Sequence, residues 1–258
     1  MKHDTYAENA AIDAEHWWYV GRRKLFARVI SELGLQAQHA AVLDAGTSTG
    51  PNLGLLRELG FIDIHAVDLS PEAVRICKSQ GFHQVRLGDV CALPYAEGTF
   101  DLVLATDVIE HVDDDSLALH ELRRVLKPGG TALITVPAFP SLWGVSDEIG
   151  EHKRRYRLRP LRERITTAGL NANQTYHFNY LLFVPIFLVR QLTRLFKGRV
   201  KNENHINTPL LNRVLTSLFS FDVRTASIVR PPAGVSIMAL CKKPLASAAA
   251  KPIATRAA

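Results

Sequence analysis

The sequence has few cysteines, no long apolar run and no spacing typical of a metal site. Its 258 residues include three isolated cysteines, Cys77, Cys91 and Cys241. This odd number argues against disulfides or a zinc site, so we expect no metal and a reducing, cytoplasmic environment. No uninterrupted apolar run reaches the roughly 18 residues that a membrane span needs. The opening stretch, MKHDTYAENAAIDAEHWW, lacks the apolar core of a signal peptide, and we expect none.

What is present is ordinary apolar content and an excess of basic charge. The chain is 47% apolar and 22% charged, with a formal net charge of +6. A chain of this length buries a substantial core as one large domain, or as one domain with an insertion. The charge fits an anionic partner such as nucleic acid, phosphate or an acidic membrane surface. Because many enzymes are as basic, charge alone does not choose among these partners.

Short apolar runs alternate with helical segments from Ala40 onward, which predicts an α/β fold with a parallel sheet covered on both faces. Ligands of such sheets bind outside the carboxyl ends of the strands, where polar residues then matter most. We predict KPGG to be a turn. The predicted strands are AAVLDAG, IHAVDLS, QVRLGDV, FDLVLATDV and TALITVP, and the predicted helices are GRRKLFARVISELGL, PNLGLLRELG, SPEAVRICKSQG and SLALHELRRVL.

The pattern changes after Pro137. RPLRERITTAGL predicts a helix, NANQTYHFNY a strand and GVSIMALCKK the last strand. Between the last two strands, residues 181–230 are predicted to form a helical insertion. We therefore divide the chain into an N-terminal helical cap (1–38), a main domain (39–245) that contains the insertion, and a disordered tail (246–258).

The stretch VLDAGTSTG fits two kinds of site. GTSTG matches G-x-S-x-G, the turn that exposes the serine nucleophile of an α/β-hydrolase, here Ser48. That turn needs strands and an oxyanion-hole loop before it, and only about 40 mostly helical residues precede Ser48. The dinucleotide fingerprint also fails, because Ser48 and Pro51 replace its second and third glycines. Asp68 ends the next strand, where a carboxylate accepts ribose hydroxyls. The sequence thus predicts a nucleoside cofactor that is not a dinucleotide.

Four motifs in order resemble class I S-adenosylmethionine-dependent methyltransferases of the type 11/12 group: VLDAGTSTG, AVDLS, GDVCALPYAEGTFDLVLATDVIEHV and RVLKPGGTALITVP. The resemblance implies a doubly wound, Rossmann-like sheet of seven strands, mostly parallel with an antiparallel last strand. It implies S-adenosylmethionine as cofactor, with the methionine part on the loop 44–50, the ribose on Asp68 and the adenine near Leu69, Asp89 and Val90. The cofactor-binding residues predicted in the core motifs are Asp44, Gly46, Ser48, Gly50, Asp68, Leu69, Asp89, Val90 and Thr106.

Ser48 departs from the family pattern, which usually has glycine there. A serine held at positive φ costs about 1 kcal/mol of strain. Its hydroxyl can recover that cost by a hydrogen bond to the cofactor carboxylate. The N-terminal EHWWYVGRRKLF resembles a segment that closes over the cofactor in similar methyltransferases, which implies that Tyr19 and Arg22 contact the methionine tail. Alternatively, the aromatic side chains pack the helix onto the sheet and the arginines are solvated.

Two histidines are candidate bases for an acceptor hydroxyl, His111 after the fourth strand and His152 after the fifth. The acidic stretch from Glu110 to Asp115 could instead suggest a metal cluster, but an acidic helix N-terminus explains it better. The segment from Pro137 to Pro160 resembles part of the same subgroup and should overhang the acceptor pocket. Its predicted substrate-binding residues are Trp143, Arg154, Arg155 and Tyr156; the alternative is a solvated charged loop.

The predicted function is S-adenosylmethionine-dependent O-methylation of a small-molecule or glycan/lipid-linked acceptor. N- or C-methylation, or a non-catalytic cofactor-binding protein at a membrane surface, are the alternatives. A nucleic-acid methyltransferase is less consistent with the sequence, because the N/D-P-P-Y/F motif of amino-methylating enzymes is absent. Residues 181–198 are apolar and then basic, which fits peripheral membrane contact. They could equally form a dimer interface or cover the sheet edge, and the sequence gives no oligomeric state.

Overall fold

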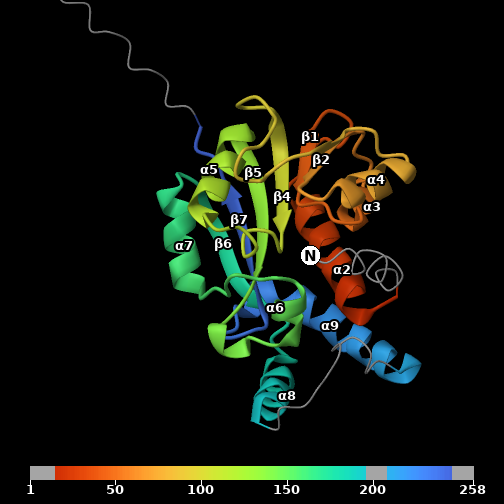
Figure 1. Ribbon diagram of the computed structural model, residues 1–258, viewed down its shortest axis with the longest axis vertical. Coiled ribbons are helices and arrows are strands. Elements are labelled where there is room, and N and C mark those ends of the chain that lie inside the picture. The colour runs from red at the N-terminus through yellow and green to blue at the C-terminus, as the bar shows by residue number, and fades with distance from the viewer. Residues whose placement is uncertain (1–14, 196–207, 246–258) are drawn as a thin grey trace, which may run out of the picture.

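The computed structural model describes residues 15–195 and 208–245, and a seven-stranded sheet forms its centre (Figure 1). The strand order is β3-β2-β1-β4-β5-β7-β6. Strand β7 is antiparallel to both of its neighbours, and the other neighbouring pairs are parallel. The predicted fold class is confirmed. The strands are β1 (Ala41–Ala45), β2 (Asp63–Asp68), β3 (Val85–Leu87), β4 (Phe100–Thr106), β5 (Leu126–Pro137), β6 (Asn171–Phe178) and β7 (Ser236–Lys242).

Helices cover both faces because alternate residues of the central strands point to opposite sides. In β1, Leu43 packs in the core with α5 and α7, whereas its neighbour Val42 packs in the core with α2, α3 and α9. Both side chains are fully buried. The helices are α2 (Trp17–Glu32), α3 (Pro51–Glu58), α4 (Pro71–Ser79), α5 (Asp115–Val125), the 3-10 helix η1 (Pro140–Leu142), α6 (Val145–Ile149), α7 (Leu158–Thr167), α8 (Phe183–Leu195) and α9 (Pro209–Val229).

Two local predictions differ from the structure. Helix α2 begins at Trp17 rather than at Gly21, because His16 caps it by accepting the Trp18 N–H at 3.3 Å. The KPGG stretch is not a separate turn but part of β5. Gly129 there has φ of 81°, and the pairing of β4 with β5 shifts register between Phe100 and Leu102. A bulge of this kind bends a strand without ending it.

Helices α2 and α9 pack against each other, although they lie far apart in the sequence (Figure 1). Asn212 accepts the Trp17 N–H at 2.9 Å. The ring of Trp18 stacks on Phe219 with 5.2 Å between centroids. A Cβ atom on Gly21 would lie 2.1 Å from the Phe219 ring, so only glycine allows this approach. The first described helix is therefore fixed by the last one.

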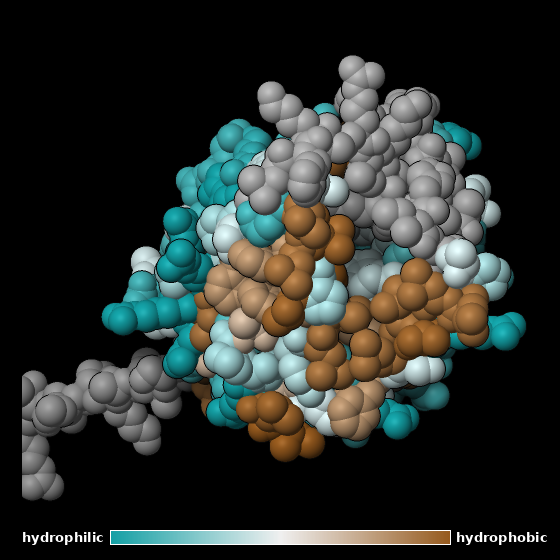
Figure 2. All heavy atoms as spheres, turned by 90° about the horizontal axis from the view of Figure 1, so that it is seen from below, coloured by the Kyte–Doolittle hydropathy of each residue, from teal (hydrophilic) through white to brown (hydrophobic). Residues whose placement is uncertain are grey.

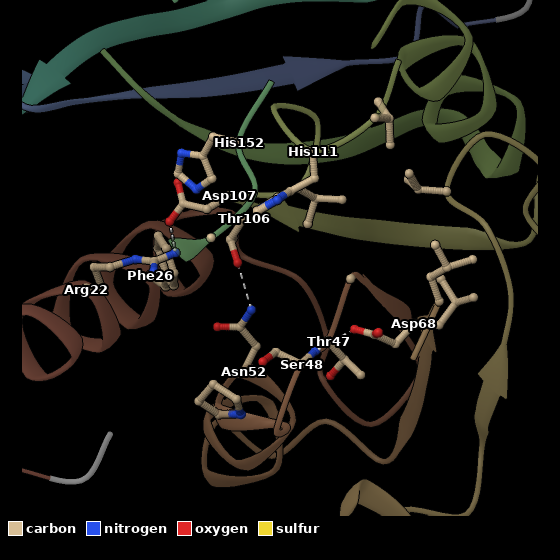
Figure 3. Close-up of a pocket in the computed structure, with 18 of the residues that line it drawn as sticks. Arg22, Phe26, Thr47, Ser48, Asn52, Asp68, Thr106, Asp107, His111 and His152 are labelled. Carbon is tan, nitrogen blue, oxygen red and sulfur yellow. Dashed lines mark hydrogen bonds and ion pairs between the residues drawn. The ribbon is translucent and has the colours of Figure 1, made fainter. Parts of the chain in front are cut away.

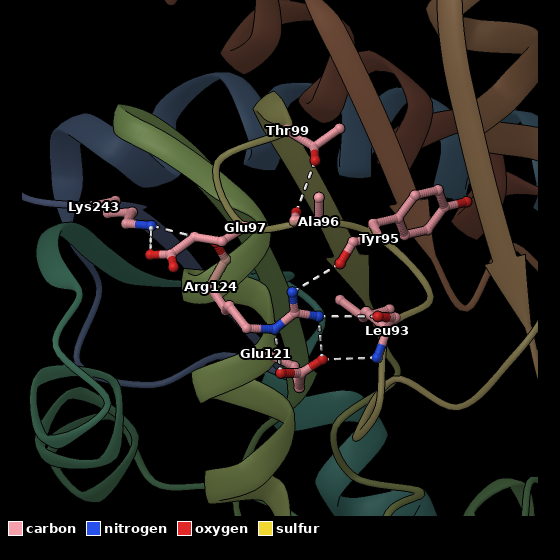
Figure 4. A network of polar contacts seen from close by, with 8 residues as sticks. All are labelled: Leu93, Tyr95, Ala96, Glu97, Thr99, Glu121, Arg124 and Lys243. Carbon is pink, nitrogen blue, oxygen red and sulfur yellow. Dashed lines mark hydrogen bonds and ion pairs between the residues drawn. The ribbon is translucent and has the colours of Figure 1, made fainter.

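The loop between β3 and β4 is tied to α5 (Figure 4). Arg124 donates to the carbonyls of Leu93 at 2.9 Å and Tyr95 at 2.7 Å. Glu121 accepts from Arg124 and also from the Leu93 N–H at 2.8 Å. These charge-assisted bonds fix the loop that begins with Asp89.

Helices α8 and α9 lie between β6 and β7, where the sequence predicts the helical insertion 181–230. The boundaries of the cap, main domain and insertion stay predictions. The predicted tail 246–258 and the first residues of the cap fall outside the described residues. No helix in the described ranges has the length and apolar character required to cross a membrane.

Candidate functional site

A cavity of about 360 Å³ lies at the carboxyl ends of β1, β2 and β4 (Figure 3). Helix α2 contributes to its wall from one side, and the loop after α6 contributes His152. Eleven of the seventeen predicted site residues line it: Tyr19, Arg22, Gly46, Ser48, Asp68, Leu69, Asp89, Val90, Thr106, His111 and His152. Their roles are not tested by position alone and stay predictions.

The turn after β1 uses a backbone that glycine tolerates best. Gly46 and Gly50 have φ of 76° and 87°, and Ser48 has φ of 52°. A Cβ atom on Gly46 would come within 2.4 Å of Val108, so this position has no room for a side chain. Gly50 does not line the cavity; it caps the N-terminus of α3. Ser48 thus occupies the positive-φ position that the family usually gives to glycine.

Asp68 is held at the end of β2 with one backbone donor on each oxygen. The N–H groups of Ser48 and Ser70 donate to Oδ2 and Oδ1, each at 2.8 Å. Burial raises the pKa of Asp68, and the bonds from Ser70 and Ser48 oppose that rise. Each carboxylate oxygen keeps a free lone pair. The carboxylate is therefore oriented and still able to accept two hydroxyl groups.

Asp44 lies behind the turn and does not line the cavity. It is fully buried, and Asn52 donates to its Oδ1 at 3.0 Å. The same Asn52 amide donates to Thr106 Oγ1 at 3.0 Å, which links β1 to β4. Asp44 Oδ2 has no partner with hydrogen-bonding geometry. Burial raises the pKa of Asp44 to about 6, although the bond from Asn52 lowers it. A cation near this oxygen would stabilise the ionised form.

Arg22 joins α2 to the segment after β4. Its Nη2 lies 2.7 Å from Asp107 Oδ2. Its guanidinium also lies over the rings of Trp18 and Phe26, at 5.6 and 5.2 Å from their centroids. Its Nε is buried without a hydrogen-bond partner. The helix thus packs through its aromatic side chains, as one interpretation predicts, while Tyr19 and Arg22 line the cavity; their contact with the methionine tail stays a prediction.

His152 is oriented by a buried carboxylate. Its Nδ1 lies 2.8 Å from Oδ1 of Asp147, which is fully buried. Asp147 also accepts from Arg155 Nε and the Gly144 N–H, both at 2.7 Å. Burial raises the pKa of Asp147, but the bonds from His152 and Arg155 outweigh burial and lower it to about 2. Because an ionised carboxylate only accepts, Nδ1 of His152 donates and its Nε2 is left to accept.

His111 lies against His152, with 4.7 Å between ring centroids and nearly perpendicular planes. Burial and the proximity of His152 lower the pKa of His111 to about 4. His111 is therefore neutral at neutral pH and a weak base. Of the two predicted bases, His152 is the one whose ring has a carboxylate at hydrogen-bonding distance.

Glu110 completes a group with the two histidines. One ligand atom from each of Glu110, His111 and His152 lies within 4.8 Å of the others, which is close enough to hold a divalent ion. Glu110 is fully buried, and neither carboxyl oxygen has a hydrogen-bond partner. Burial and the nearby Asp107 raise its pKa well above the ordinary value. Without a metal this favours the protonated acid, and the absence of a metal stays our prediction.

The four predicted acceptor residues do not line the cavity. Arg155 is buried and donates to the Ala138 carbonyl at 2.9 Å. Tyr156 donates to Asp115 at 2.8 Å, and Arg154 donates to the Asp113 carbonyl at 2.8 Å. These contacts hold the segment after α6 against the segment after β4. The contacts of Trp143 include its N–H, which donates to Pro140 at 3.1 Å. Acceptor binding by these four residues stays a prediction.

The sequence argument did not identify several cavity residues. Phe26 lies four residues after Arg22 on the same face of α2, and this helical spacing could have indicated it. Thr47, Asp107 and Val108 lie inside the quoted motifs, although the sequence argument did not name them individually. No local signal in the sequence marks Asn52, because its role depends on contacts with Asp44 in β1 and Thr106 in β4. Of the cavity residues that the sequence argument did not assign to the site, only Pro51 and Asn52 lie outside the motifs and flanking segments quoted for it; Arg23, Val67, Gly88, Val112 and Gly150 lie inside them.

Comparison with known families places this site in a recognised domain. Residues 43–134 match the family model described as a methyltransferase domain. This segment includes the glycine turn, Asp68, Asp89 and His111. It is therefore a methyltransferase domain, of the class that uses S-adenosylmethionine, and the resemblance drawn from the motifs is confirmed.

Individual relatives share this part of the chain. Norajmaline N-methyltransferase of Rauvolfia serpentina is 37% identical over 100 residues, covering 36% of this chain and 34% of the relative. A malonyl-[acyl-carrier protein] O-methyltransferase of Halorhodospira halophila is 33% identical over 124 residues, covering 45% and 42%. The chain thus spans less than half the length of either relative.

A solved structure shares the fold over a longer stretch. Phosphoethanolamine N-methyltransferase 2 of Haemonchus contortus, crystallised with S-adenosyl-L-methionine, has a TM-score of 0.55 at 18% identity. The match covers 84% of this chain and 51% of that protein. At this identity the likeness establishes the fold and not the acceptor.

Proposed function

We propose, with the methyltransferase domain at residues 43–134 as the premise, that the protein transfers a methyl group from S-adenosylmethionine to a hydroxyl group. The acceptor would be a small molecule or a glycan- or lipid-linked compound. One observation carries the proposal: a single cavity contains both the turn with Asp68 and the oriented base His152. A cofactor cradle and a proton acceptor are the two parts that methyl transfer to oxygen requires.

The residues present fit the cofactor. Asp68 has lone pairs for two ribose hydroxyls, and the unpartnered Nε of Arg22 suits the carboxylate of the methionine part. Asp44, buried with an unpaired oxygen, favours the ammonium group of the same zwitterion. When bound, the cofactor supplies a methyl group activated by a sulfonium. The protein then has to align the acceptor, exclude water and take up one proton.

His152 is the proposed proton acceptor. Its Nε2 takes the hydroxyl proton as the acceptor oxygen becomes methylated, and the ionised Asp147 stabilises the resulting imidazolium. His111 has a pKa near 4, so it would orient the acceptor rather than take its proton. The O-methyltransferase among the relatives is consistent with this chemistry, and the N-methyltransferase shows that the domain serves nitrogen acceptors in other proteins.

Cofactor binding is tested by calorimetric titration with S-adenosylhomocysteine. Asp68→Ala removes the ribose acceptor and should weaken binding by about tenfold or more, because two charge-assisted hydrogen bonds are lost. Asp63→Ala is the matched control, since Asp63 begins the strand that Asp68 ends and lies at its amino end, away from the cavity. Equal affinity of wild type and Asp68→Ala would contradict the assigned cofactor site.

The base is tested by labelled methyl transfer to a panel of hydroxyl and amine acceptors. His152→Asn should lower turnover of a hydroxyl acceptor by about 100-fold or more while keeping the affinity for S-adenosylhomocysteine. His111→Asn is the control at the neighbouring ring and should have a smaller effect on turnover. Normal cofactor affinity with no transfer to any acceptor would favour a non-catalytic cofactor-binding protein instead.

A further inference from the structure

Helices α8 and α9 expose apolar side chains on one end of the molecule, where Figure 2 shows two neighbouring hydrophobic areas. In α8, Val184, Leu188 and Leu192 follow one another at intervals of four residues and therefore share a helix face. Their exposed fractions are 59%, 54% and 51%. The opposite side of α8 holds Arg190, which is buried. A surface helix usually buries its apolar side and exposes its charged side chains, and α8 has the opposite arrangement.

Helix α9 has an apolar stripe along its outer side. At roughly 100° per residue, four side chains fall within about 40° of one another. The helix buries Phe219, Val223 and Ala226 on the opposite side. Both sides of α9 are therefore apolar, although only one is covered by the described protein. The stripe consists of Leu210, Val214, Phe221 and Ile228, which are between 56% and 80% exposed.

The exposed charges described on these helices are all positive. The only acid is Asp222, which is fully buried and accepts the N–H groups of three consecutive residues after β6. Arg213 and Arg224 are exposed and lie within about 80° of Leu210 around the helix axis, beside the stripe. The two helices and the residue that follows α9 contain five arginines: Arg190, Arg194, Arg213, Arg224 and Arg230.

We propose that this surface, formed by the outer faces of α8 and α9, docks on a membrane that contains anionic lipids. Apolar side chains bordered by arginines are what an interfacial helix needs, because the acyl region receives the former and lipid phosphates the latter. A second copy of the chain is a poorer partner. A symmetric dimer through α9 would bring arginines together, and α9 has no exposed acid to pair with them.

The docking surface is connected to the α2 wall of the cavity and to the 3-10 helix η1. Helix α9 packs on α2, which carries Tyr19 and Arg22. Helix α8 holds η1, since Arg190 donates to the Leu142 carbonyl and Gln191 donates to the Ser141 carbonyl at 3.0 Å. Figure 1 shows both helices beyond the carboxyl ends of β4 and β5, the end at which the cavity lies. If the proposed methyl transfer holds, the acceptor is then a hydroxyl compound anchored in that membrane.

Vesicle flotation of the full chain tests the surface. We expect binding to vesicles of phosphatidylglycerol and phosphatidylcholine, weaker binding to phosphatidylcholine alone, and a decrease with added salt. The patch variant Leu192→Ser/Phe221→Ser should lower the partition constant by at least about tenfold. The matched control is Ile62→Ser/Leu245→Ser. These two side chains are 72% and 76% exposed and lie at the opposite end of the sheet, near the amino ends of the parallel strands.

The charge contribution has its own variant. Arg213→Gln/Arg224→Gln should lower binding to the anionic vesicles by about tenfold or more, with little effect on neutral vesicles. Failure of wild type to bind either vesicle, or equal binding by wild type and the patch variant, would overturn the proposal. A concentration-dependent dimer that the patch variant abolishes would also overturn it in favour of self-association. No cofactor enters the assay, so its outcome is separate from that of the methyl-transfer proposal.

Discussion

The buried pair of Asp147 and Arg155 makes Asp147→Asn a strong test of how the candidate base is held. Both side chains are at most 4% exposed, and their atoms are 2.7 Å apart. Asparagine keeps the shape of aspartate but removes its charge, so the buried cation Arg155 loses the ionised carboxylate beside it. Breaking a buried pair in this way costs on the order of 3 kcal/mol.

A second estimate comes from the titration of Asp147. Its pKa is lowered from 3.8 to about 2, and burial means that the shift needs no discount for solvent screening. Each unit is worth about 1.4 kcal/mol, so ionised Asp147 contributes about 2 kcal/mol. Because the folded pKa is depressed, this contribution is complete above pH 3.8 and is lost as the pH falls towards 2. At neutral pH both estimates apply in full.

Thermal unfolding measures the effect. A loss of about 3 kcal/mol lowers the Tm by about 6–12 °C in a domain of this size. Arg155→Met added to Asp147→Asn should recover part of the loss, because the buried cation that has lost its carboxylate is removed, and the double-mutant cycle should give a coupling of about 1.5–3 kcal/mol. A Tm change below about 2 °C for Asp147→Asn would refute the argument, since the charge would then be solvated.

Three further predictions concern the turn and the second histidine. Gly46→Ala should lower the free energy of unfolding by about 2–3 kcal/mol in urea, because the Cβ meets Val108; Gly34→Ala, which also has positive φ but open space, should cost only about 1 kcal/mol. Ser48→Gly should raise that free energy by about 1 kcal/mol, and no gain would mean that the serine is unstrained. For His111, the folded pKa of about 4 lies below the unfolded 6.5, so its contribution is present above pH 6.5 and is lost towards pH 4. Wild type should therefore lose about 2 kcal/mol relative to His111→Asn between pH 7 and pH 5, and parallel urea curves at both pH values would contradict this.

The sequence predicts the sheet and the side of the cavity formed by the ends of its parallel strands because their signals are local. Each strand of the parallel part is a short apolar run, and the polar residue that ends it, such as Asp68 or Thr106, meets the others at one edge of the sheet. The sequence also predicts the turn around Ser48, since glycines indicate the positions at which φ is positive. These features depend on neighbours within a few residues, which a sequence displays directly.

The side of the cavity that carries His152 could not be predicted in the same way. His152 was a candidate base, but its pairing with Asp147 and the support from Arg155 depend on the path of a loop. The same arginine is predicted to bind substrate, and a charged stretch gives no sign of which of its side chains are buried. The contact of Trp17 with Asn212 joins residues too far apart for any spacing rule to indicate it.

The packing of α2 on α9 sets the order in which the site can be completed as the chain is synthesised. At about 5–20 residues per second, α9 follows α2 from the ribosome after on the order of 10–40 s. During that interval the turn and Asp68 can assemble, but the wall that carries Tyr19 and Arg22 lacks its contacts with α9. If Tyr19 and Arg22 hold the methyl donor as predicted, a chain stalled before α9 would bind it less tightly, and full affinity would report that synthesis has passed the last described helix.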